Sequence, residues 1–315
     1  MAHEGLDVLI AKDLGQPLDY NLKVSPVLSE IANIETAQPG ELVRIFNYTG
    51  EDASADDIYT ADANGALTAH KVSAVSPATL TFAGLQSTIE YVLINEVLPA
   101  VDQNALARKK AGIGRAMDKE ELYRILNAIL ALDGGTGEPD LEVVQATGDD
   151  LYDLIDKMVT AVEDYADDYV LLASASVFRA IRNYDKDNST VAAYRVGLDT
   201  YLENAGIKVI KVKGAVIDTG GTHSVLLASG KMILIGRNSE FAAGKPITFV
   251  RRLMTPEIAK AMNSESAERA ISIANAPVPI VSNGSGTLGW ACFGYESVIE
   301  AICNYKAICF ASYTA

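Results

Sequence analysis

A chain of 315 residues, 49% of them hydrophobic, is long enough to bury a core in one large domain or in two joined ones. Lys and Arg number 26 against 41 Asp and Glu, and the net charge of −15 disfavours broad contact with nucleic acid or an anionic membrane. The N-terminus lacks the basic and apolar segments of a secretion signal, and no apolar run is long enough for a membrane helix. We therefore expect a protein that stays in a reducing cytoplasm.

The first third of the sequence reads as an arm followed by an extended β region. Residues 1–38 are weakly patterned and contain Pro17 and Pro26, which prevent a long helix. From Glu41 to Val97 the sequence is rich in Thr, Val, Ile and Tyr, and the pair Asn64-Gly65 fits a type I′ hairpin turn. The acidic run at 51–57 lacks the ligand order of a calcium loop. The segment 79–97 is too long for one flat strand, so we expect part of this region to project from the body.

Two helices are predicted next. The first follows Asp102 and places Leu106, Ile113 and Met117 on one face, and the second begins at an Asp118 cap. The second helix carries an apolar stripe and ends before Gly134, the stripe being Leu122, Ile125, Leu126, Ile129 and Leu130.

The glycines in ARKKAGIGRAMD, residues 107–118, raise the question of a phosphate-binding loop. A dinucleotide loop needs a preceding strand and a third glycine, but Gly112 follows a polar helical run and Met117 occupies the third position. We therefore interpret Gly112 and Gly114 as a bend or close-packing point in a helix. A cytosolic nucleotide-dependent enzyme remains a weak alternative that rests on these glycines alone.

The second half of the chain has an α/β pattern. Residues 149–164 form an amphipathic helix, followed by a strand at 169–174, helices around 178–182 and 191–204, and a helix stop at Gly206. Strands are expected at 207–213, 223–229, 231–237 and 246–253, and again in the tail at 289–313. In the strand beginning at Ile207, Lys208 faces away from Lys211 and Lys213, which indicates a lysine-protected edge strand.

Residues that would carry catalysis or bind a metal do not form a pattern in this sequence. The three histidines have no metal spacing, and no G-x-S-x-G motif occurs. Cys292, Cys303 and Cys309 are expected to be small buried hydrophobic residues. We therefore expect a protein that is not an enzyme and that uses no cofactor and no metal.

The order of these elements resembles the major capsid proteins of tailed double-stranded DNA phages, the Hong Kong 97 type of capsid fold. The segments that carry the resemblance are PGELVRIF to TLTFAGLQSTIEYVL, NALARKKAGIGRAMDKEELYRILNAIL, YVLLASASVFRAIRN, GIKVIKVKG with LLASGKMILIGRN, and GWACFGYESVIEAICNYKAI. Together they cover most of the chain.

The resemblance implies an α+β fold with five parts. These are an N-terminal arm at 1–38, an extension loop with its return strand at 39–99, a spine helix and peripheral domain at 100–164, an axial domain at 165–285, and C-terminal strands at 286–315 that close the body. The family often has a long cleaved N-terminal scaffolding extension, for which 38 residues are too few. A separate scaffold protein, or none, is therefore implied.

The resemblance also implies a function. The chain would assemble with itself into hexamers and pentamers of an icosahedral virion shell that encloses double-stranded DNA, in the host cytoplasm, with portal and decoration proteins as further partners. An encapsulin-like compartment is the alternative, which would package cargo enzymes instead of a genome. Some relatives crosslink a loop lysine to a neighbour's asparagine, and Lys71 is a candidate, although no partner asparagine is identified. The candidate assembly contacts are Asn64, Gly65, Lys71, Arg108, Lys109, Lys110 and Arg115.

Overall fold

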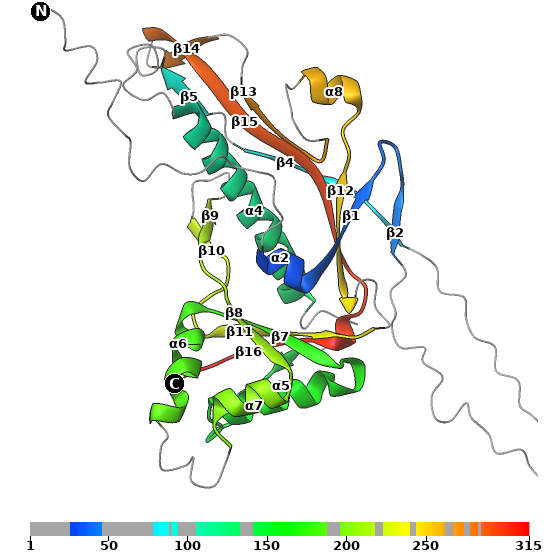
Figure 1. Ribbon diagram of the computed structural model, residues 1–315, viewed down its shortest axis with the longest axis vertical. Coiled ribbons are helices and arrows are strands. Elements are labelled where there is room, and N and C mark those ends of the chain that lie inside the picture. Colours follow the sequence, from blue (N-terminus) through cyan, green and yellow to red (C-terminus); the bar gives the residue numbers. More distant parts are fainter. Residues whose placement is uncertain are drawn as a thin grey trace, which may run out of the picture. The chain divides into compact units, whose positions relative to one another are not determined.

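The computed structural model describes residues 26–45, 78–87, 90–93, 105–132, 141–187, 196–217, 223–239, 244–261, 267–273, 278–282 and 285–314. Helices and strands alternate irregularly in a mixed α+β fold (Figure 1). The contacts divide the chain into two compact units. Unit 1 comprises 1–23, 84–118 and 253–297, and unit 2 comprises 24–83, 119–252 and 298–315.

Unit 1 is built around the long strand β15 (Ser285–Ile302), whose residues up to 297 belong to it. Strands β13 (Arg269–Ile273), β14 (Val278–Ser282) and β5 (Glu90–Leu93) pair with β15 in antiparallel fashion, and β4 (Ala83–Gln86) also pairs with it. The unit also contains the first half of helix α4 (Ala105–Ala131) and the short helix α8 (Pro256–Ala261).

A glycine in β15 lets α4 pack closely on this sheet. A Cβ added at Gly294 would collide with the side chains of Met117 and Ile113 on α4. These two residues form a small buried cluster with Ile271 and Cys292. Gly294 on the strand is therefore a close-packing glycine, whereas a Cβ at Gly112 on the helix would meet nothing within 4 Å. A packing role for the buried Gly114 stays a prediction.

Unit 2 contains a five-stranded sheet in the order β6-β16-β11-β7-β8. Its strands are β6 (Glu142–Val143), β16 (Ile308–Ser312), β11 (Lys231–Arg237), β7 (Asp168–Ala173) and β8 (Ile207–Lys211). β11 is antiparallel to both β16 and β7, and the outer pairs β7–β8 and β16–β6 are parallel. β8 is an edge strand, as the lysine pattern predicted.

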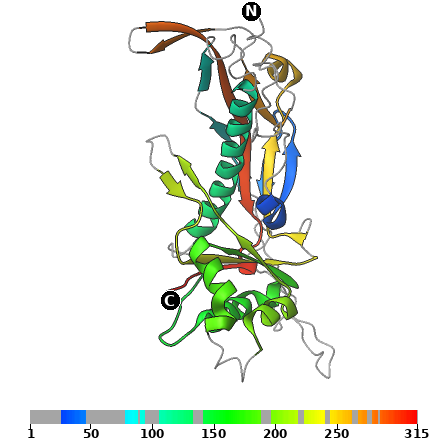
Figure 2. The same ribbon diagram turned by 60° about the vertical axis from the view of Figure 1, so that its left-hand side comes forward.

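One face of this sheet is covered by three helices, α5 (Leu151–Val162), α6 (Ala175–Asp187) and α7 (Leu198–Asn204), drawn in green in Figures 1 and 2. Alternate strand residues, such as Leu171 and Leu234, pack with the helices in one core cluster. Their neighbours Leu172 and Ile233, which point to the other face, are also fully buried. A sheet buried on both faces explains why these strands read as continuous apolar runs.

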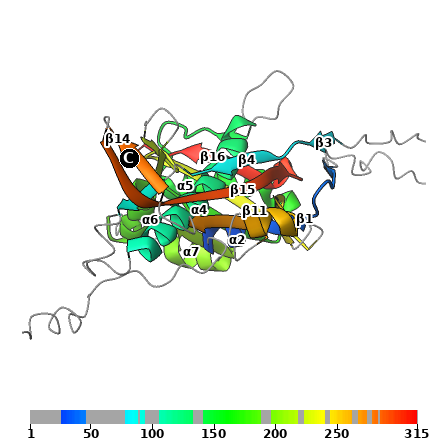
Figure 3. The ribbon, with the colours of Figure 1, turned by 90° about the horizontal axis from the view of Figure 1, so that it is seen from above.

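The remaining part of unit 2 begins with helix α2 (Pro26–Ile31) and strand β1 (Ala32–Ala37). β1 runs parallel to β12 (Ile247–Arg252), which pairs antiparallel with the last residues of β15. β2 (Val43–Ile45) and β3 (Ala78–Leu80) form a two-stranded antiparallel ladder, with β3 labelled in Figure 3. A second small ladder joins β9 (Ala215–Ile217) to β10 (His223–Val225). Short 3₁₀ turns lie at Glu163–Tyr165 and Tyr305–Ala307.

Several predicted elements are confirmed. The amphipathic helix predicted at 149–164 is α5, which Asp150 caps in a capping box with Asp153. Its buried residues are spaced along one face, as an amphipathic helix requires: Leu151, Leu154, Ile155, Met158 and Val162. Gly206, with φ +68°, ends α7 at the predicted residue. The return segment from residue 79 is broken into β3, β4 and β5 within the described residues, as its length predicted.

The prediction of two helices between 102 and 132 is wrong. α4 runs without interruption through Asp118, which therefore lies in the interior of the helix and is no N-cap. Its carboxylate accepts a 2.6 Å hydrogen bond from Arg269. A capping-box pattern inside a helix can therefore mark a tertiary ion pair instead of a helix start.

Candidate functional site

A catalytic centre is not recognisable in the described part of the chain. Among those residues, no three His, Cys, Asp or Glu side chains are grouped as a metal site would require. Gly112 and Gly114 lie inside α4, more than a turn after its first residue, so their N–H groups lie within the helix and form no phosphate-binding loop. No described helix has the length and apolar character needed to cross a membrane.

The cysteines fit a structural role. Cys292 and Cys309 are buried, and Cys303 is half-buried. Burial raises the pKa of Cys309 to about 12, so its thiol stays protonated and unreactive in the folded chain. The expectation of burial is confirmed for two of the three cysteines.

The predicted assembly residues divide into two groups. Asn64, Gly65 and Lys71 lie outside the described residues. Arg108, Lys109, Lys110 and Arg115 lie on α4, and all except the half-buried Lys110 are exposed. Arg108 and Arg115 are two helical turns apart and therefore share a face. Their role in assembly stays a prediction.

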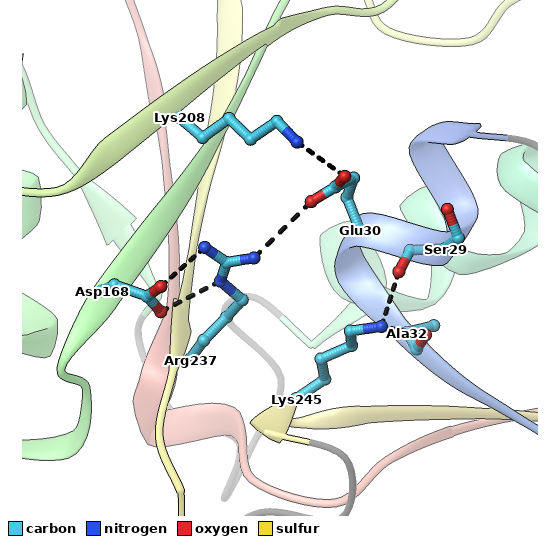
Figure 4. A network of polar contacts seen from close by, with 7 residues as sticks. All are labelled: Ser29, Glu30, Ala32, Asp168, Lys208, Arg237 and Lys245. Atoms are coloured by element: carbon cyan, nitrogen blue, oxygen red, sulfur yellow. Dashed lines mark hydrogen bonds and ion pairs between the residues drawn. The ribbon is translucent and has the colours of Figure 1, made fainter.

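A polar network in unit 2 joins α2 to the five-stranded sheet (Figure 4). Glu30 of α2 accepts a 2.6 Å hydrogen bond from Lys208 of β8 and lies 3.5 Å from the guanidinium of Arg237 on β11. Arg237 in turn donates two hydrogen bonds, of 3.0 and 2.6 Å, to Asp168 of β7. The hydrogen bond from Lys208 is the main reason that the pKa of Glu30 lies below its ordinary value of 4.5.

Lys245 completes this network at the end of α2. Its ammonium donates to the carbonyl of Ser29 at 2.5 Å and to that of Ala32 at 3.2 Å, as the direction of its side chain in Figure 4 shows. These carbonyls lie at the C-terminal end of α2, where a cation is favoured. Burial is the main cause that lowers the pKa of Lys245 from 10.5. Leu28 and Ile31 of α2 are both 0% exposed, so the helix also contributes apolar side chains to the core. The network and these residues together hold α2 in place in unit 2.

Buried ion pairs hold α4 to neighbouring strands within each unit. In unit 2, Arg251 of β12 makes two 2.8 Å hydrogen bonds to Glu121, and both side chains are at most 1% exposed. A half-buried pair of the same kind joins Arg124 to Glu300. In unit 1, Arg269 binds both Asp118 and Glu296.

The roles of Glu30, Lys245, Arg237 and the arginines that pair with α4 were not predicted from the sequence. One signal was available: Asp118, Glu121 and Arg124 recur every three residues and so fall on one side of a helix. Pro26 was a second available signal, for the start of α2: it is the first residue of that helix, a position where proline is favoured. The strand partners of these residues lie far away in sequence, so no local pattern reveals them.

No protein-family model matches the sequence, and no curated protein matches it. Solved structures do. A prophage protein of E. coli CFT073 assigned as a capsid protein is 10% identical, with 93% of this chain and 94% of that chain covered and a TM-score of 0.53. The SrpI encapsulin of Synechococcus elongatus PCC 7942 is 13% identical over 99% and 95% of the two chains, with a TM-score of 0.51. A virus-like particle protein of Pyrococcus furiosus is 12% identical over 90% and 92%, with a TM-score of 0.50.

These similarities extend over nearly the whole of each chain, and at such low identity they define the fold. The protein has the Hong Kong 97 type capsid fold, as its element order predicted. The structures it resembles are phage capsid proteins and encapsulins, which build protein shells.

Proposed function

We propose that this chain is the structural subunit of a closed protein shell and that it is a major capsid protein of a tailed phage. The observation that carries the proposal is the likeness, across at least 90% of the chain, to phage capsid and encapsulin structures. Capsid proteins and encapsulins are structural proteins, and the likeness to them favours a structural role without enzymatic activity for this chain.

In this proposal the subunits form hexamers and pentamers of an icosahedral shell around double-stranded DNA. The α2 network fixes the start of an N-terminal arm, and β2 with β3 forms the stem of the extension loop. Shell assembly would take place in the host cytoplasm, with scaffold, portal and decoration proteins as partners. Many modest contacts repeated by symmetry would give a durable shell.

The net charge of −15 supports enclosure of DNA by a wall instead of by a basic lining. We expect no measurable affinity of the isolated subunit for duplex DNA at physiological salt. A gel-shift series across salt concentrations measures this. A tight complex that weakens steeply with salt would show instead that a basic cluster, such as Arg108 with Arg115, binds phosphate.

An encapsulin-like compartment is the second candidate, and the likeness to the SrpI encapsulin favours it as strongly. The contents of particles purified from the native source separate the two. Nuclease-protected double-stranded DNA of uniform length supports the capsid, whereas one co-purifying enzyme inside DNA-free particles supports the compartment.

A further inference from the structure

Arg252 is the last residue of β12, and it lies in register beside Ala37, the last residue of β1. The chain leaves β1 through a turn in which the N–H of Glu41 donates to the carbonyl of Gln38 at 3.0 Å and the N–H of Gln38 donates to the Glu41 carboxylate at 2.8 Å. Gly40 takes the left-handed conformation in this turn, with φ +83°. The turn leads into β2, so Arg252 stands where the stem of the β2–β3 hairpin begins.

The side chain of Arg252 contacts both arms of that stem. Its Nη2 donates a 3.2 Å hydrogen bond to the carbonyl of Glu41, two residues before β2. Its guanidinium carbon lies 3.7 Å from the ring centroid of Phe82, two residues after β3. Residues 46–77 separate the two strands of the stem in the sequence. The guanidinium group of Arg252 nevertheless contacts the chain both before and after this segment.

Among the described residues, the stem is supported by a short ladder and by one small apolar cluster. The β2–β3 ladder has three residue pairs, and a short isolated hairpin is at best marginally stable in water. The apolar contact consists of the half-buried Val43, Leu80 and Phe82 against Ala37, Val250 and Ile299. Arg252 adds to this attachment a cation–π contact in which the guanidinium carbon lies well inside 6 Å of the Phe82 ring centroid.

An arginine suits this position better than a lysine would. A planar guanidinium can stack on a ring while it donates in its own plane to a carbonyl, and an ammonium cannot do both. Among the described residues, the buried Nε of Arg252 has no hydrogen-bond partner. The Phe82 ring and the Glu41 carbonyl are the contacts that orient this group.

We propose that Arg252 is a positioning residue, which fixes the β2–β3 stem on β12, and that association of the chain with further copies of itself depends on this attachment. This inference rests on the proposed shell function. It predicts that loss of the Arg252 contacts weakens assembly while the core of the subunit stays intact.

The test compares the variants Arg252→Ala, Arg252→Lys, Phe82→Leu and Phe82→Tyr with the wild-type chain. Arg182→Ala, on the exposed face of α6, is the matched control for loss of an arginine. Amide hydrogen exchange reports on the stem at 43–45 and 78–80 and on the core strands β7 and β11. Light scattering and electron microscopy report particle formation.

We expect stem exchange about tenfold faster in Arg252→Ala and several-fold faster in Arg252→Lys and Phe82→Leu. Core exchange should stay unchanged, and particle yield should fall in the same order. Phe82→Tyr, which keeps the ring, and Arg182→Ala should behave as the wild type.

Unchanged stem exchange in Arg252→Ala overturns the inference, as does faster exchange in stem and core together, which would show a general structural role. Normal particle yield despite a loosened stem overturns it as well. A wild-type chain that forms no particles refutes the proposed function instead, while stem exchange still decides whether Arg252 holds the hairpin.

Discussion

The buried pair of Arg251 and Glu121 gives the sharpest prediction about stability. Glu121→Gln removes the carboxylate charge that faces the Arg251 guanidinium at a site that is 1% exposed. Breaking a buried pair from one side costs about 3–5 kcal/mol, because the remaining charge keeps its desolvation cost and loses the attraction of the group that was removed. We expect a loss of that order in the free energy of unfolding for Glu121→Gln, and a similar loss for Arg251→Met.

Replacing both residues tests the reasoning further. In the double variant Glu121→Leu with Arg251→Met neither member of the pair is charged, so we expect much of the lost stability to return. The pair of Arg124 and Glu300 is the control, since it has the same residue types and a similar two-bond geometry at 26% and 21% exposure. Arg124→Met should cost about 1 kcal/mol or less.

Urea unfolding followed by circular dichroism measures these losses, provided that the dependence on urea concentration has the same slope in every variant. Two results would refute the reasoning: single variants at Arg251 or Glu121 that lose no more than Arg124→Met, or a double variant that loses the sum of the two single losses.

Three further predictions concern the loop, the α2 network and the cysteines. Replacing residues 51–71 by a short glycine turn should leave a cooperative melt but stop shell closure, and loss of that melt would place the segment in the core. The pKa of Glu30 is lowered in the folded chain, so its stabilisation is present above about pH 4.5 and is lost as the pH falls through the folded pKa. The stability difference between the wild type and Glu30→Gln should therefore shrink in acid, and a difference that grows there would contradict the geometry. In the native chain at pH 8 a thiol reagent should modify the half-buried Cys303 much faster than Cys309, and equal rates would argue against the burial described.

The sequence allowed most regular elements to be predicted wherever one face of a helix or strand is apolar. α5, β7 and β11 are of this kind, because burial against one sheet imposes a simple period on their residues. The continuity of α4 could not be predicted in the same way. Gly112, Gly114 and the Asp118 pattern all suggested an interruption, and the contacts that override them come from Arg269 and from the glycine at 294.

The polar contacts that position α2 and the hairpin stem could not be predicted. Glu30 and Lys208 are 178 residues apart, and Arg252 and Glu41 are 211 apart. Each of these residues looks like an ordinary surface charge in its own segment. Only the fold brings them together, and the fold was reached from the order of elements instead of from any single motif.

Electron microscopy of the purified full-length protein tests the central claim most directly. Samples should span a range of protein and salt concentrations, with light scattering to follow association. We expect closed particles of uniform size, or rings of five and six subunits as their precursors. A protein that stays monomeric under every one of these conditions, and with its co-expressed phage proteins, would contradict the claim that this chain builds a shell.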